Sequence, residues 1–154
     1  MVLDDKDSIL AQVDMLIDRA KSLPHNVFKL RGGHFLLMPF DTVRLPDFFT
    51  ALKKCLLKIN ETEFIVSAID PDPILYFEHH FKDFLGILRF SCDDNETVYI
   101  QALGGYPVTS PADALMHNGN KMVFFSSSHK WVIYADRDED VAIFAFNDSE
   151  CKQV

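Results

Sequence analysis

The feature that most constrains the fold of this chain is a set of three apolar segments separated by short polar turns. The segments are residues 121–125, 131–136 and 141–146, and the turns between them are centred on residues 126–129 and 137–140. Apolar runs of this length, bounded by polar turns, indicate β-strands. Because a parallel crossover needs about a dozen residues or more, connections this short predict an antiparallel meander.

Apolar residues at helical spacing predict two long helices. Residues 5–23 carry such a pattern and stop before Pro24, and residues 46–59 begin with a proline that the first helical turn tolerates. A shorter helix is expected from Ser110, which is a suitable N-cap. Residues 74–84 are ambiguous, although their phenylalanine spacing favours a helix.

Further strands are expected outside the meander. Short apolar runs predict them at residues 63–69, 85–90 and 98–103, and two runs around Gly32-Gly33 predict a β-hairpin over residues 27–38. Helices and strands do not alternate strictly. We therefore predict an α+β fold, with a mostly antiparallel sheet and helices packed on one face.

Size and composition indicate one domain. A chain of 154 residues with 48% apolar residues can bury a core without disulfides or a metal ion. No internal repeat or linker divides it, so residues 1–154 are interpreted as a single domain. Residues 147–154 are polar and are expected to form a frayed tail.

Charge narrows the class of partner. Asp plus Glu number 23 against 15 Lys plus Arg, giving a net charge of −8. An acidic surface repels phosphate groups, so we expect no nucleic-acid partner and no membrane partner. A basic protein partner is favoured instead.

The cysteines and the first residues predict a cytoplasmic protein. Cys55, Cys92 and Cys151 are odd in number and widely spaced, which is typical of thiols in a reducing compartment. The acidic start of the chain lacks the basic residues and apolar run of a signal peptide.

No motif identifies a reaction, a metal or a cofactor, and none of the three is predicted. The adjacent His79 and His80 beside Glu78 lack the i, i+4 spacing of helical zinc ligands. Ser126 to His129 contains hydroxyls and an imidazole, but serine runs are also ordinary turn residues. An alternative stays open: a small enzyme or ligand-binding domain whose pocket, between sheet and helices, contains His79, His80, His117 or His129.

An acidic turn is the main candidate for partner binding. Asp136, Asp138, Glu139 and Asp140 surround Arg137 between two apolar segments. Such a turn is often only a solvated loop, but it could also dock a basic partner. Asp93 and Asp94 form a second acidic turn that would extend the surface if the two lay together. Tyr134 is a candidate aromatic anchor.

The segment from Ser128 to Asp138 resembles small bacterial immunity proteins of toxin–immunity systems. The likeness rests on the pattern Trp-x-Ile-Tyr-x-Asp-Arg at residues 131–137, followed by a short apolar strand. It covers about 20 residues at the level of a strand-turn-strand motif. The resemblance implies an acidic, cytoplasmic, non-enzymatic protein that binds a cognate toxin domain.

We therefore predict a binding protein that neutralises or regulates a basic protein partner. The contact residues are expected to be Asp136, Arg137, Asp138, Glu139 and Asp140, supported by Asp93, Asp94 and Tyr134.

Overall fold

The computed structural model describes residues 5–30, 33–73, 86–104, 115 and 119–147, and the structural statements below concern these residues. The elements in chain order are α1 (Asp5–Leu16), β1 (His34–Met38), the 3-10 helix η1 (Phe40–Arg44), α2 (Pro46–Lys58), β2 (Glu63–Asp70), β3 (Ile87–Ser91), α3 (Glu96–Leu103), β4 (Lys121–Phe125), β5 (Trp131–Asp136) and β6 (Val141–Phe146).

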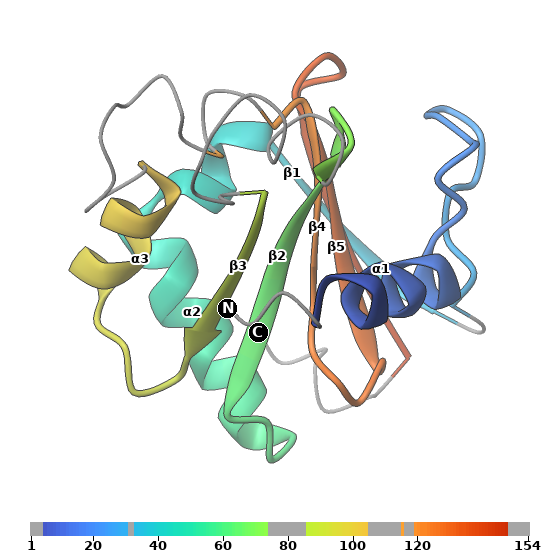
Figure 1. Cartoon of the computed structure of the whole chain (residues 1–154). Helices are drawn as coiled ribbons and strands as arrows, with labels where there is room; N and C mark the ends of the chain where they lie inside the picture. The colour runs from blue at the N-terminus through green and yellow to red at the C-terminus, as the bar shows by residue number, and fades with distance from the viewer. Residues whose placement is uncertain (1–4, 31–32, 74–85, 105–114, 116–118, 148–154) are drawn as a thin grey trace.

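These strands form one antiparallel sheet in the order β1-β6-β5-β4-β2-β3 (Figure 1). The predicted α+β class with an antiparallel sheet is confirmed. The meander β4-β5-β6 is confirmed at the predicted boundaries, and Ile133 at its centre pairs with Phe124 on one side and Phe144 on the other.

Helices cover both faces of the sheet, whereas the sequence was interpreted as placing them on one. In Figure 1, α2 and α3 lie on one side of the sheet and α1 on the other. Phe64 and Val66 of β2 belong to the core on the α2 side, while Ile65 between them belongs to the core on the α1 side. The physical reason is that β4 and β5 are buried at nearly every position, so both of their faces need an apolar cover.

The predicted helix 46–59 corresponds to α2, and Phe49, Leu52, Cys55 and Leu56 form its buried stripe as expected. The predicted strands 63–69 and 85–90 correspond to β2 and β3.

The strand predicted at residues 98–103 is wrong, because this segment forms α3. Asn95 caps the helix by accepting a hydrogen bond from the Val98 amide at 2.9 Å. Tyr99 and Leu103, four residues apart, are buried on its inner face. A short apolar run fits a strand and a buried helix equally well, so the cap was the signal that distinguished them.

Two predictions near the start of the chain also need correction. Helix α1 ends at Leu16 rather than at residue 23, because Ile17 forms a β-bridge with Phe28. The hairpin around Gly32-Gly33 does not form, since β1 pairs with β6 and residues 27–30 form no strand. The predictions for residues 74–84, for the helix from Ser110 and for the tail after Asn147 lie outside the described residues.

Candidate interaction surface

Strand β1 forms one edge of the sheet and exposes apolar side chains. It pairs with β6 from His34↔Phe146 to Met38↔Ala142, and no other described strand pairs with it. Leu37 is 66% exposed, Phe35 53% and Leu36 47%. Large apolar side chains are scattered singly on most surfaces, so three in a row on an edge strand make β1 a candidate contact surface.

On the α2 side of β1 lies an open groove of about 430 Å³, here called the α2-side groove. Leu36 and Met38 of β1 form one wall, and Phe48 at the start of α2 forms the opposite wall. Thr42 and Asp47 contribute the polar part of the lining. The remaining lining residues are Leu37, Ala51, Leu52, Ile133 and Phe144.

On the α1 side of β1 lies a second open groove of about 280 Å³, the α1-side groove. Its walls are Phe35 and Leu37 of β1 and the segment from Leu23 to Phe28, with Ile143 between them. The rings of Phe28 and Phe35 pack with their centroids 5.6 Å apart. The exposed strand β1 is therefore flanked by an apolar groove on each face.

Carboxylates gather where β1 ends. Met38 is followed by Pro39 and then by η1, which packs against β5 and β6. The guanidinium of Arg137, in the β5–β6 turn, lies 5.4 Å from the ring of Phe40 in η1. Asp41 of η1 and the exposed Asp138 of that turn therefore both lie near Arg137.

Charged neighbours at this end include cations as well as carboxylates. Arg44 binds Asp41 at 3.0 Å. The pKa of the Arg137 guanidinium is lowered, chiefly by burial and then by Arg44, while Asp41 and Asp138 oppose the change. Asp47 lines the α2-side groove nearby. Carboxylates outnumber guanidinium groups here, so the apolar edge has an acidic margin.

Two of the predicted contact residues are buried. Asp136 is 1% exposed, and its Oδ1 accepts a hydrogen bond from the Glu139 amide at 3.2 Å, which fixes the turn. Tyr134 is also 1% exposed, and within the described residues its hydroxyl has no hydrogen-bond partner. Burial, and then Asp136 and Asp70, raise the pKa of Tyr134 to about 12. Neither side chain is presented to a partner, whereas Asp138, Glu139 and Asp140 are.

The two predicted acidic turns lie at opposite ends of the sheet. Asp70 of β2 is level with Lys121 and hence with Asp136, whereas Glu63 at the other end of β2 is level with Ser91. Asp93 and Asp94 follow Ser91, so they do not join the β5–β6 turn in one patch. Asp94 has a local role, since its Oδ2 accepts a hydrogen bond from the Ser91 amide at 2.8 Å.

The histidines of the alternative prediction do not form a pocket within the described residues. His129 Nε2 lies 3.0 Å from Gln12 Oε1 of α1. Glu78, His79, His80 and His117 lie outside the described residues. No group of three or more His, Cys, Asp or Glu in the described part of the chain could hold a metal ion.

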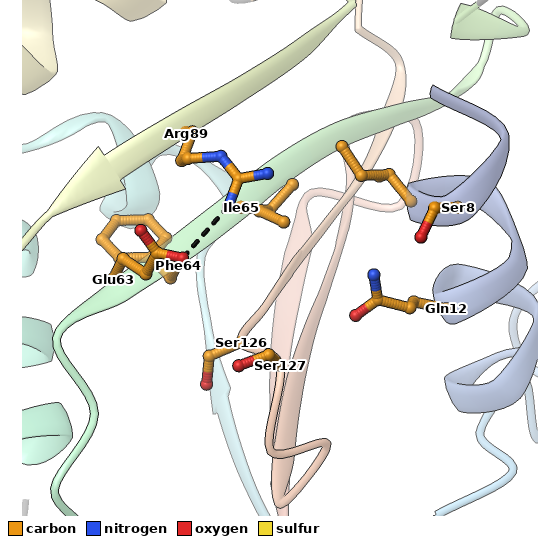
Figure 2. Close-up of a pocket in the computed structure, with 9 residues that line it drawn as sticks. Ser8, Gln12, Glu63, Phe64, Ile65, Arg89, Ser126 and Ser127 are labelled. Carbon is orange, nitrogen blue, oxygen red and sulfur yellow. Dashed lines mark hydrogen bonds and ion pairs between the residues drawn. The ribbon is translucent and has the colours of Figure 1, made fainter. Parts of the chain in front are cut away.

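A small polar pocket lies beside the serine run (Figure 2). Figure 2 shows the ion pair of Arg89 and Glu63 on one side of it, and Ser8 and Gln12 of α1 on the other. Arg89 Nη1 lies 3.0 Å from Glu63 Oε1. Its volume of about 60 Å³ suits one or two water molecules and is far below that of a substrate site. Ser126 at its margin already accepts a hydrogen bond from Trp131 Nε1 at 2.7 Å.

Sequence reasoning missed the exposed residues Phe35, Leu36 and Leu37, because they were assigned to a hairpin with residues 27–30. The available signal was a run of consecutive apolar residues without alternation, ended by Pro39.

Cys55 and Cys92 both remain thiols. No described helix has the length and apolar character needed to cross a membrane.

No protein-family model matches this chain, and neither the curated proteins nor the solved structures contain a significant match to it.

Proposed function

We propose that this chain is a non-enzymatic binding protein that neutralises or regulates a basic protein partner in the cytoplasm. The observation that carries the proposal is the exposed apolar strand β1 with carboxylates at its end. The resemblance of residues 128–138 to immunity proteins supports the same function, with a toxin domain as the partner.

Apolar and charged groups would play different roles in such an interface. Burying Phe35, Leu36 and Leu37 removes apolar surface from water, which supplies affinity. Asp138, Glu139 and Asp140 contribute mainly to the rate of encounter, because exposed charges act over about a Debye length. The net charge of −8 favours a basic partner over an acidic one.

A second candidate is a domain that binds an apolar small molecule. The volume of the α2-side groove, about 430 Å³, falls within the range of small-molecule sites. Thr42 and Asp47 would be the polar groups that orient such a ligand.

The test requires a partner captured from the native host and identified, followed by association kinetics at two salt concentrations. The Asp138→Ser/Glu139→Ser variant keeps Asp140, whose φ of 51° serine would adopt less readily than aspartate. We expect its association rate to fall by roughly tenfold at low salt, and the wild-type rate to fall as salt rises.

The matched control is Asp7→Ser/Asp93→Ser, which removes the same charge from exposed positions away from the β5–β6 turn. Its association rate should stay close to that of the wild type. An association rate insensitive to both salt and the turn variant would contradict the proposal. Capture of no protein, together with a small molecule that raises the melting temperature, would favour the ligand-binding candidate.

A further inference from the structure

Strand β1 offers a row of backbone groups to a further strand. Its outer edge pairs with no described strand. Natural sheets protect exposed edges with prolines, charged side chains or bulges. The sequence His-Phe-Leu-Leu-Met of β1 contains no proline and no Lys, Arg, Asp or Glu, and its register with β6 has no irregularity. By contrast, the β2–β4 ladder contains a register shift.

The two grooves indicate that an element docking on the outer edge of β1 would be a strand rather than a helix. Phe35 and Leu37 lie level with Ala145 and Ile143 and face the α1 side, whereas Leu36 lies level with Phe144 and faces the α2 side. An added strand would lie about 4.8 Å beyond β1, with alternate side chains directed to opposite faces. It would cover both grooves at once, whereas a docked helix would cover only one.

The charges near β1 favour a basic segment as the strand that binds its outer edge. Asp47 of the α2-side groove and the exposed Asp138, Glu139 and Asp140 of the β5–β6 turn lie toward the Met38 end of β1, where Asp41 is already paired with Arg44. A second copy of this chain would bring the same net charge of −8 and a β1 strand with His34 as its single ionisable residue. A basic segment fits this end of the edge better than a second copy does.

We propose that an extended segment of the basic partner adds to the outer edge of β1 as a further strand. Its alternate residues are apolar, and a lysine or arginine at one end lies beside Asp47. The proposal rests on the proposed function and specifies how the partner is recognised. Backbone hydrogen bonds to β1 and side chains in the two grooves then share the recognition.

The test measures amide hydrogen exchange by NMR, because only strand addition protects outward-facing β1 amides. The probe is a seven-residue peptide of alternating valine and threonine with two lysines at one terminus, compared with the same peptide carrying two glutamates. At ten times its Kd, the lysine peptide should slow exchange of the β1 amides that do not donate to β6 by about tenfold. The glutamate peptide at the same concentration should not.

Variants at exposed positions should keep the fold, and they test whether the protection comes from a strand added to β1. Leu37→Lys places a charge on the edge and should abolish the protection, whereas Leu57→Lys, on the exposed face of α2, should leave it unchanged. Absence of β1 protection with millimolar lysine peptide would overturn the proposal. So would concentration-dependent dimerisation that Leu37→Lys disperses, because a second copy would then occupy the edge.

The same exchange measurement on the captured partner distinguishes this proposal from the proposed function. Salt-sensitive binding without protection of β1 would reject strand addition and leave the basic-partner function standing. Salt-insensitive binding without protection of β1 would reject both.

Discussion

Ser126, Ser127 and Ser128 are chemically identical and adjacent, but their surroundings differ. Ser126 is 1% exposed and accepts the indole N–H of the buried Trp131, while Ser127 and Ser128 are exposed. The sequence indicates a polar turn and a buried tryptophan. It does not indicate which hydroxyl is the partner, because that depends on how the turn closes in three dimensions.

Replacing Ser126 with alanine should destabilise the fold, since the Trp131 N–H would stay buried without an acceptor. We expect Ser126→Ala to lower the free energy of unfolding by roughly 1–3 kcal/mol, measured by urea denaturation. Ser127→Ala is the matched control and should change it by less than about 0.5 kcal/mol. Equal effects of the two substitutions would show that the Trp131 hydrogen bond does not stabilise the fold.

Among the elements, α2 was predictable and α3 was not. The stripe of Phe49, Leu52 and Leu56 repeats at helical spacing over several turns, which no strand can satisfy. Helix α3 has eight residues, so its apolar pattern is too short to exclude a strand. Long periodic segments were therefore assigned correctly from the sequence. For short apolar segments, the choice between helix and strand depends on tertiary contacts.

Adjacent leucines on α2 provide a test of that packing. Leu56 is fully buried and Leu57 is 57% exposed. Leu56→Ala should cost roughly 2–5 kcal/mol in the free energy of unfolding, because it leaves a cavity against the sheet. Leu57→Ala should cost less than about 0.5 kcal/mol. Similar costs in urea unfolding would mean that the stripe is assigned to the wrong face.

Glu96 of α3 contacts two residues of α2. Its carboxylate accepts a hydrogen bond from the Thr50 hydroxyl at 2.7 Å and lies 3.2 Å from Lys53 Nζ. The Thr50 hydrogen bond first, and then the helix backbone and Lys53, lower the pKa of Glu96 from 4.5 to about 2. A lowered pKa means that this carboxylate stabilises the fold above about pH 4.5. That stabilisation is lost as the pH falls toward 2.

Thr50→Val removes the largest cause of this shift, so the pKa of Glu96 should rise toward its ordinary value. The measurement is an NMR titration of the Glu96 side-chain carboxyl. Thr97→Val, at an exposed position on α3, is the control and should leave the pKa unchanged. A Glu96 pKa that stays near 2 in Thr50→Val would assign the shift to Lys53 and the helix backbone instead.

At the scale of the whole molecule, sequence reasoning predicted the class of the fold and the acidic turn but not the apolar edge. The turn of Asp138 to Asp140 is local, so its position followed from the two segments on either side of it. The edge depends on β1 pairing with β6, which joins His34 to Phe146 across most of the chain. No local pattern shows that β1 pairs with a strand so distant in sequence. The Gly32-Gly33 pair instead suggested pairing with residues 27–30.

This strand order also bears on how the chain is synthesised and folded. The meander β4-β5-β6 pairs through short connections and can form early, whereas β1 must wait for β6, the last strand of the sheet. During translation, His34 to Met38 leave the ribosome long before residues 141–146 exist to pair with them. Until β6 exists, the nascent chain therefore carries an apolar segment that has no strand to pair with. Strand β1 can join the sheet only once β6 has been made.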